Sequence, residues 1–335
     1  MLSFSLSRSA SSRAKNRRSA FSAEKRAITL IAILAALSVR AQGPEQWAPL
    51  EKTLNFYVAN DLGRNGYYDQ KTIADLMGRM AEVVDIEFVA APGDIHHFNG
   101  VQSTQDPLWM TNYELIYSHP DLMLDWYPLL GNHEYRSNTQ ACIDYSNISA
   151  RWRFPSRYYT RVITTKDSLT LRLVMVDTSP LIDKYREDTE EYPDAQYQDP
   201  EAELAWVDSV LTVADEDWVV VMGHHPIYAD TGKDTSERAD MQKRLDPILR
   251  AHPCVSFYVC GHIHTFQHIR MPGSDIDYVV NTSGSLARTE VNDVEGTQFK
   301  STLSGFSLMC ADKQSLDLHF IDKDGNVVYT ISRTK

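Results

Sequence analysis

The apolar positions of the chain fall into short runs rich in β-branched and aromatic residues, each about the length of a β-strand. These runs predict strands at Leu54–Ala59, Ile86–Ala91, Trp126–Leu130, Leu169–Val176, Trp218–Met222, Val255–Cys260 and Tyr278–Val280. Between some of them, apolar residues recur at three- and four-residue steps, which predicts helices. The helical series are Ile73, Leu76, Met77, Met80 and Val84; Leu204, Val207 and Leu211; and Met241, Leu245 and Ile248. Strands that alternate with helices indicate an α/β domain.

The C-terminal part of the chain has a different pattern, with strands but no helix between them. Phe306–Cys310, Leu316–Ile321 and Asn326–Ile331 are predicted strands, and Asp322–Gly325 forms a turn between the last two. We expect them to end a sheet of the same domain.

The N-terminus carries a secretory pattern. Residues 1–26 are rich in Ser, Arg and Lys, the apolar run Ala27–Val39 follows, and the small residue Ala41 precedes Gln42. The run is shorter than the ~20 residues of a membrane-spanning helix. We therefore predict a signal peptide at residues 1–41 and a catalytic domain at residues 42–335, with an uncleaved anchor as the alternative. The expected location is secreted or periplasmic, with no stable membrane span after cleavage.

Charge and cysteine content narrow the classes of function. The formal net charge of −12 over 335 residues argues against a general nucleic-acid binder. The four cysteines, Cys142, Cys254, Cys260 and Cys310, include no CxxC pair, so cysteine-ligated zinc is not expected. Buried free thiols are the simplest interpretation, although export would permit a disulfide whose pairing the sequence does not determine.

Residue types that ligate metals follow five of the predicted strands. The five segments are Asn60–Gly63, Pro92–His97, Gly131–Glu134, Gly223–Pro226 and Gly261–His264. In open α/β folds, functional groups collect at the carboxyl ends of strands. Taken singly, Asp61, Asp94 or Asn132 is as easily a turn or cap residue. Gly261-His262-Ile263-His264 is the most specific segment, because residues two apart in an extended chain can bind adjacent ions.

Together, the five segments predict a metal site. Glycines beside the ligands allow the backbone to turn sharply and approach an ion. Imidazole with carboxylate suits zinc, iron or manganese better than calcium. Two such ions can clamp a phosphate between them and activate a water molecule.

The order GD, GD, GNH[DE], GH, GHxH resembles the signature of the calcineurin-like metallophosphoesterase superfamily. Here Asn60 stands in place of the first Gly. The stretches Gly93–Val101, Tyr145–Tyr159, Val174–Thr178 and Phe320–Ile331 are similar to the tartrate-resistant purple acid phosphatases. The resemblance covers about residues 50–335. It implies a four-layer α/β/β/α sandwich with two mixed β-sheets.

The resemblance also implies roles for individual residues. Asp94 would bridge two metal ions, and His133 would be the general acid that protonates the leaving group. The first metal site would be completed by Asp61, His97 and His264, and the second by Asn132, His224 and His262. The implied cofactors are two metal ions, iron with zinc, manganese or a second iron.

Two departures from the family pattern affect these expectations. The purple enzymes carry a metal-binding Tyr where this chain has His97, so we expect a non-purple protein less committed to ferric iron. They also carry a His after the Gly-His-Tyr-Pro block, and Tyr228–Lys233 contains none. His96 and His225 are the candidates for that polar contact.

The predicted function is metal-dependent hydrolysis of small phosphate monoesters by a hydroxide activated between two metal ions. One alternative is a phosphodiesterase acting on nucleotides or phospholipids with the same metal pair. Another is a metal-stabilised protein that binds phosphoesters without turnover. The sequence does not indicate an oligomeric state.

Overall fold

The computed structural model describes residues 44–233 and 235–335. Trp47–Lys335 forms a compact unit, and the described residues before it form a short 3₁₀ helix, η1 (Pro44–Gln46). The predicted signal peptide at residues 1–41 lies outside the described residues. No helix in the described part of the chain combines the length and apolar character needed to cross a bilayer.

The first sheet has six strands and combines parallel and antiparallel pairs. β1 (Leu54–Val58), β2 (Phe88–Ala91) and β3 (Asp125–Pro128) run parallel to one another, and every residue of β1 and β2 is buried. This burial explains their continuous apolar runs. The C-terminal strands continue the sheet beyond β1 as antiparallel neighbours, as expected. They are β11 (Gly305–Ala311), β12 (Ser315–Asp322) and β13 (Val327–Thr334).

The second sheet has seven strands in the order β10-β8-β9-β7-β6-β5-β4. Its centre is parallel and buried, with β7 (Val255–Cys260) between β6 (Trp218–Met222) and β9 (Asp277–Val280). The remaining strands are β4 (Tyr159–Thr164), β5 (Thr170–Met175), β8 (Phe266–Ile269) and β10 (Thr297–Ser301).

The two sheets contact each other through aromatic stacking and buried polar bonds. The rings of Phe266 on β8 and Phe320 on β12 stack with centroids 4.4 Å apart. The indole of Trp218 on β6 donates to the carbonyl of Asp312 at 2.7 Å. Asn281, which follows β9, donates to the carbonyl of Val58 on β1 at 3.0 Å.

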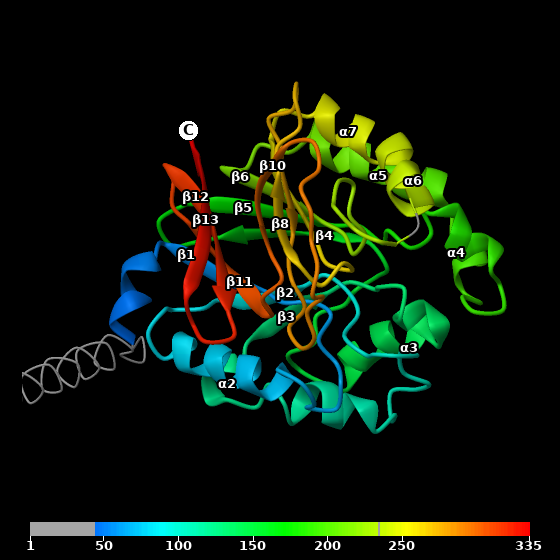
Figure 1. Ribbon diagram of the computed structural model, residues 1–335, viewed down its shortest axis with the longest axis horizontal. Coiled ribbons are helices and arrows are strands. Elements are labelled where there is room, and N and C mark those ends of the chain that lie inside the picture. The colour runs from blue at the N-terminus through cyan, green and yellow to red at the C-terminus, as the bar shows by residue number, and fades with distance from the viewer. Residues whose placement is uncertain (1–43, 234) are drawn as a thin grey trace, which may run out of the picture. The chain divides into compact units, whose positions relative to one another are not determined.

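Helices cover the outer faces of the two sheets (Figure 1). In that view, α2 (Gln70–Ala81) lies on one side of the sheets, and α5 (Pro200–Thr212), α6 (Thr235–Arg244) and α7 (Asp246–Ala251) lie on the other. The expected α/β class with two mixed sheets is therefore confirmed. The shorter helical segments are η2 (Ala48–Leu50), η3 (Met110–Glu114), η4 (Pro120–Leu122), η5 (Glu134–Arg136), α3 (Thr139–Asp144), η6 (Tyr145–Asn147), α4 (Asp183–Glu187) and η7 (Ala195–Tyr197).

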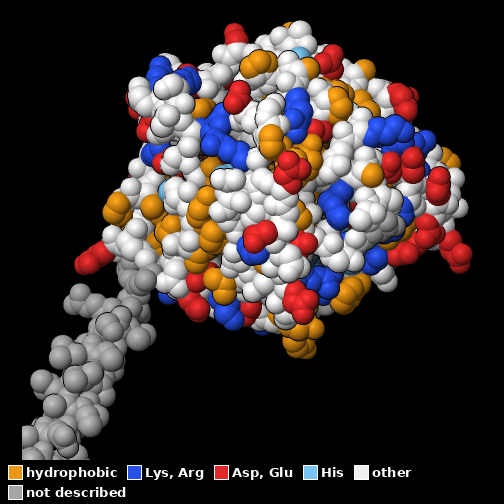
Figure 2. Space-filling model, turned by 45° about the horizontal axis from the view of Figure 1, so that its top comes forward, with side chains coloured by type: hydrophobic (Ala, Val, Ile, Leu, Met, Phe, Trp, Pro, Cys, Tyr) orange, Lys and Arg blue, Asp and Glu red, His pale blue; other side chains and the backbone are white. Residues whose placement is uncertain are grey.

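Surface and cysteine chemistry add little that constrains function. All four cysteines are free thiols, and Cys142, Cys260 and Cys310 are buried. On the face shown in Figure 2, basic and acidic side chains are interspersed, and hydrophobic side chains occur in small groups between them. The buried His and Asp side chains at the carboxyl ends of the parallel strands are therefore the feature that indicates function.

Candidate functional site

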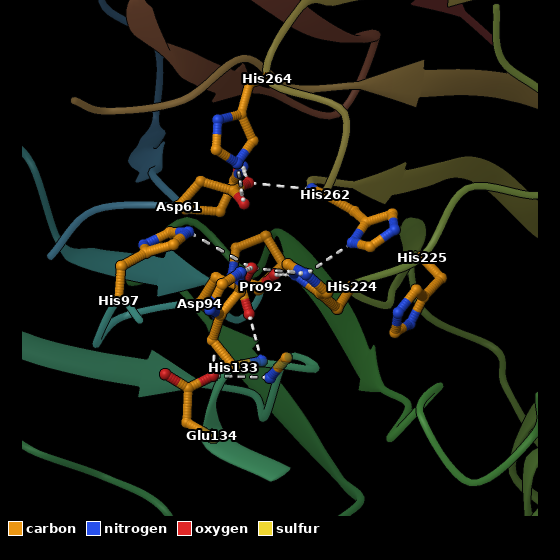
Figure 3. Close-up of polar contacts among 12 residues, drawn as sticks. Asp61, Pro92, Asp94, His97, His133, Glu134, His224, His225, His262 and His264 are labelled. Atoms are coloured by element: carbon orange, nitrogen blue, oxygen red, sulfur yellow. Dashed lines mark hydrogen bonds and ion pairs between the residues drawn. The ribbon is translucent and has the colours of Figure 1, made fainter. Parts of the chain in front are cut away.

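The five predicted segments converge at one place. β1, β2 and β3 of the first sheet and β6 and β7 of the second each deliver a segment from their carboxyl ends. Figure 3 shows their carboxylate and imidazole groups turned toward one another around Asp94. The expected clustering of Asp94 with His224, His262 and His264 is therefore found in the structure.

One group consists of Asp61, Asp94, His97 and His264. These four side chains are buried, and one ligand atom from each lies within 4.8 Å of the others. His264 Nε2 is 2.9 Å from Asp61 Oδ1, and His97 Nε2 is 3.6 Å from Asp94 Oδ2. The structure thus brings together the full set expected for the first metal site.

The second group lies on the other side of Asp94. His224 Nε2 is 3.2 Å from Asp94 Oδ2, and His262 Nδ1 is 3.3 Å from His224 Nε2. Asn132 is 5% exposed, and its Oδ1 atom has no hydrogen-bond partner. Asp94 therefore faces both groups, as a bridging ligand must.

Carbonyl groups on the far sides of two imidazoles hold their rings in place. His224 Nδ1 lies 2.9 Å from the carbonyl of Pro92, and His264 Nδ1 lies 2.8 Å from that of Leu286. These contacts favour the tautomers that leave Nε2 free to bind a metal.

The donor set fits a pair of cations. The carboxamide oxygen of Asn132 and both ring nitrogens of His97 are buried without hydrogen-bond partners. A buried polar atom left unpaired costs about 1–3 kcal/mol. Metal ions at the two groups would satisfy the Asn132 oxygen and one nitrogen of His97, and they would offset the charges of Asp61 and Asp94.

The electrostatics of the site favour charged carboxylates. Burial alone would raise the pKa of Asp61, but His264 and His224 lower it to about 2. Burial would likewise raise the pKa of Asp94, and His224, His133 and His97 hold it well below the usual range. Burial lowers the pKa of His97, so its imidazole is neutral, as a metal ligand must be.

The backbone around Asp94 is held by the segment after β3. Glu134 is buried and accepts hydrogen bonds from the amides of Asp94, His96 and Gly131 at 2.8–2.9 Å. Gly131 has no side chain, and a Cβ added there would overlap Oδ1 of Asp94. Gly131 therefore permits the close approach of the two segments.

His133 lies at the mouth of the site. Its Nδ1 atom is 2.5 Å from the carbonyl of Phe98, and its Nε2 atom is 3.7 Å from Asp94 Oδ2. With Nδ1–H donating to that carbonyl, Nε2 faces the metal-ligand groups. This orientation suits a group that exchanges a proton with a substrate bound there.

Two residues that the sequence did not predict as part of the site lie beside the second group. Lys233 Nζ lies 3.0 Å from His262 Nε2 and 2.8 Å from the carbonyl of His262. Glu237 on α6 is 3% exposed, and its Oε2 atom is 2.9 Å from His262 Nε2. Lys233 ends Tyr228–Lys233, the stretch that lacks the His of the related enzymes. Its positive charge was the one sequence feature that could have indicated a role at the site.

His96 and His225, the candidates to replace the His that Tyr228–Lys233 lacks, lie in different surroundings. His96 packs its ring against Trp109 at 4.5 Å and contacts Asn112, which places it outside the ligand groups. His225 Nδ1 contacts Thr178 Oγ1 at 2.9 Å, and its ring centroid is 4.4 Å from that of His262.

An open cavity of about 360 Å³ leads to the second group. It has a mixed lining of cationic, acidic and aromatic side chains. They are Asn132, His133, Arg136, Lys184, Tyr185, Tyr192, Lys233, Glu237, His262 and Arg288.

Comparison with known proteins gives a consistent result. Residues 54–266 match the family model of the calcineurin-like phosphoesterases. The chain is 30% identical to purple acid phosphatase 3 of Arabidopsis thaliana, over 84% of this chain and 78% of that protein. It is 26% identical to tartrate-resistant acid phosphatase type 5 of Rattus norvegicus, over 84% and 90%. The solved structure of GAP50, described as the anchor in the inner membrane complex of Plasmodium, is similar in fold. Its TM-score is 0.70 at 21% identity, over 84% of this chain and 88% of that one.

Proposed function

Because the chain belongs to the calcineurin-like phosphoesterase family, we propose that it is a metal-dependent phosphatase that hydrolyses phosphate monoesters. The observation that carries this proposal is that the buried carboxylate of Asp94 lies 3.6 Å from His97 in one ligand group and 3.2 Å from His224 in the other. Asp61, Asp94, His97 and His264 would hold one ion. Asp94, Asn132, His224 and His262 would hold the other.

Two cations held by these groups would offset the charge of a bound phosphate and would lower the pKa of a water molecule. The imidazoles and carboxylates of the two groups have lone pairs that can bind the cations. Their burial keeps bulk water away from them. This mixed donor set favours iron, zinc or manganese at both positions.

His133 protonates the leaving oxygen of the substrate. Its Nε2 atom faces the ligand groups, while Nδ1 is fixed by the carbonyl of Phe98. Lys233, near His262, supplies a positive charge that attracts and orients the phosphate.

The test combines elemental analysis with a panel of phosphoesters. Asp94→Asn should lose bound metal and turnover together, because both ligand groups depend on that carboxylate. His133→Ala should retain its metal and lose about 10²–10⁴-fold in kcat on an alkyl monoester, which needs a protonated leaving group. Full activity of the His133 variant on that ester would refute its role.

Substrate preference is tested with p-nitrophenyl phosphate and the bis-ester of p-nitrophenol. The described chain beyond Trp47 is one compact unit, which favours a small monoester over a large diester. Faster turnover of the bis-ester would instead support the phosphodiesterase alternative.

The contact between Lys233 and His262 favours a second candidate, a protein that binds phosphoesters without turning them over. An ammonium group beside His262 would compete with the second cation. This candidate predicts one metal ion per chain and no metal-dependent turnover, whereas the phosphatase needs two ions.

Export of the protein is proposed from residues 1–41 alone. Mass spectrometry of the natively produced protein should find an N-terminus at Gln42. An intact basic leader on the mature protein would contradict the signal-peptide prediction.

A further inference from the structure

Asn60 stands where the family signature has Gly, directly before the proposed metal ligand Asp61. Its side chain is fully buried, and its Nδ2 atom donates to Asp61 Oδ2 at 2.5 Å. Asn60 is not among the proposed ligands, yet its carboxamide contacts a ligand carboxylate. Its role therefore has to be found in what this contact does to Asp61.

Asn60 is the last member of a chain of hydrogen bonds that leads to Asp61. Ser307 on β11 donates to Asn281 Oδ1 at 2.7 Å. Asn281, which follows β9, donates in turn to Asn60 Oδ1 at 2.6 Å. The side chains of Ser307, Asn281 and Asn60, here called the amide relay, are all fully buried. The relay thus connects a strand from each sheet to the ligand carboxylate.

Backbone carbonyl groups determine the direction of the relay. Asn281 Nδ2 also donates to the carbonyl of Val58 at 3.0 Å, and Asn60 Nδ2 donates to the carbonyl of Thr282 at 3.1 Å. A carbonyl oxygen can only accept, so each carboxamide must turn its amino group toward it. The relay therefore presents a hydrogen-bond donor to Asp61, and turning either carboxamide over would leave a buried carbonyl facing an oxygen.

The relay leaves one oxygen of Asp61 available. Asp61 Oδ2 accepts from Asn60 and also from the amide of His262, at 2.9 Å. Asp61 Oδ1 has no hydrogen-bond partner and lies 2.9 Å from His264 Nε2 (Figure 3). Because Nδ1 of His264 contacts the carbonyl of Leu286, Nε2 bears a lone pair. Two lone pairs thus face each other, and a cation bound by both would satisfy them.

Gly261 leaves the Asp61 carboxylate no space in which to turn. A Cβ added at Gly261 would overlap both Asn60 Nδ2 and Asp61 Oδ2. The backbone of Gly261 therefore packs directly against the hydrogen bond between these two side chains. Rotation of the carboxylate would break both bonds to Oδ2 and leave buried donors unpaired, which is unfavourable.

We propose that Asn60 is a positioning residue for the first metal site. The amide relay holds the carboxylate of Asp61 so that Oδ1 binds the ion while Oδ2 stays bonded to protein donors. Partners of this kind behind a metal ligand typically contribute 10–100-fold in metal affinity. The inference rests on the proposed metal centre, but it concerns the binding of an ion rather than turnover.

The test measures metal binding by protein that has been freed of metal. Equilibrium dialysis against defined free Zn²⁺, followed by elemental analysis, gives the dissociation constant of each bound ion. Asn60→Ala should weaken one of the two binding steps about 10-fold and leave the other within about 2-fold. Ser307→Ala removes one hydroxyl that contacts no proposed ligand, and it should weaken the same step about 3-fold.

A spectrum of bound Co²⁺ reports the ligand geometry directly. Because the d–d absorption of Co²⁺ depends on the arrangement of its ligands, the band of the ion at the weakened step should change shape in Asn60→Ala. A purely structural role for Asn60 would lower stability without changing this band.

Asn55→Ala is the matched control. Asn55 is a buried Asn of β1, 2% exposed, and its carboxamide contacts the backbone of Lys52 and Asp85 at the other end of the strand. This variant should lose stability but keep both dissociation constants and the Co²⁺ spectrum. Equal weakening of both steps in Asn55→Ala and Asn60→Ala would show a general effect on the fold and would overturn the proposal. If Asn60→Ala does not fold, an unchanged affinity in Ser307→Ala overturns it.

The same measurements separate this inference from the phosphatase proposal. If the unaltered protein binds two ions but hydrolyses no ester, and Asn60→Ala still loses affinity at one step, the phosphatase proposal fails and the positioning role stands. If hydrolysis is metal-dependent but Asn60→Ala keeps both affinities and the Co²⁺ spectrum, the positioning role alone fails. Unaltered protein that binds no metal ion would refute both.

Discussion

Four of the proposed metal ligands have positive φ angles, a backbone conformation that residues other than glycine rarely adopt. Asp61, Asp94, His262 and His264 have φ between 54° and 71°. Such residues cost about 1–3 kcal/mol each and persist only where the surroundings fix them. At Asp61 the fixing groups are visible, because Ser283 and Ser285 both donate to its carbonyl at 2.8–2.9 Å. The strain at these positions is consistent with selection for ligand geometry rather than for stability.

We expect His97 to influence which oxidation state the proposed first metal site favours. Its neutral imidazole stabilises a trivalent ion less than a phenolate would. We therefore predict that His97→Tyr loaded with ferric iron gains a visible absorption band that the unaltered protein lacks. The band is read by absorption spectroscopy alongside iron content.

His97→Phe is the matched control for this spectrum, since it has a ring but no ligand oxygen. It should remain colourless. A purple iron-loaded protein with His97 in place would show that the phenolate argument does not apply to this site.

At the scale of elements, the sequence predicted the strands that carry the site better than three other strands of the second sheet, β4, β8 and β10. β1, β2, β3, β6 and β7 have continuous apolar runs because both faces are buried. The edge strands β4 and β10 contain mostly exposed or partly exposed residues, and β8 contains the polar residues Gln267 and His268, so none was predicted. Their pairing partners, rather than their own composition, determine these three strands.

The proposed ligands were predictable for a related reason. Each follows a recognisable buried strand within a short motif, and the structure brings Asp61, Asp94, His97 and His264 into one group and His224 and His262, with His225, into another. Glu237 was not predictable in this way, because α6 is mostly polar and follows a loop with no motif of its own. Its approach to His262 depends on how α6 packs against the second sheet.

Glu237 gives α6 a specific role at the second metal site. Its Oε2 atom lies 2.9 Å from His262 Nε2, while His262 Nδ1 lies 3.3 Å from His224 Nε2. Lys184 and Tyr185 on α4 hold the other carboxylate oxygen at 2.8 Å. A carboxylate behind a metal-binding His typically contributes 10–100-fold in metal affinity.

We predict that Glu237→Gln weakens binding of the second ion about 10-fold and leaves the first ion bound. Elemental analysis after dialysis against defined free metal measures both occupancies. Glu201→Gln, an exposed change in the first turn of α5, is the control and should retain both ions. Equal loss of both ions in Glu237→Gln would indicate general disruption of the fold rather than positioning of His262.

At the scale of the whole molecule, a second pair of buried acids affects stability without contacting the proposed ligands. Asp177 follows β5, and its amide donates to Glu203 of α5 at 2.7 Å. Burial raises the pKa of Asp177 to about 7, although Arg157 and Tyr135 oppose the increase. Burial and the nearby charge of Asp177 raise the pKa of Glu203 well above its usual range.

These raised values make the fold depend on pH in a defined direction. In the unfolded chain, both carboxyl groups titrate near pH 4. Between about pH 4 and pH 7, the folded protein therefore binds more protons than the unfolded chain. The contribution of this pair to the free energy of unfolding is then complete at low pH and is lost as pH rises through that window. Such a dependence suits a protein that works in an acidic environment.

Glu203→Gln tests this dependence, because Gln keeps the oxygen that accepts from the Asp177 amide but does not titrate. We expect the variant to lose less stability than the unaltered protein between about pH 4.5 and about pH 7.5, by about 1–2 kcal/mol. Denaturant unfolding of both proteins at the same free metal concentration measures their free energies of unfolding at each pH. The pH dependence of metal binding is common to both proteins and cancels in the difference. Parallel stability profiles would show that the pair is charged in the folded protein at all pH values tested. In that case, the charge of Arg157 would outweigh the effect of burial on both carboxyl groups.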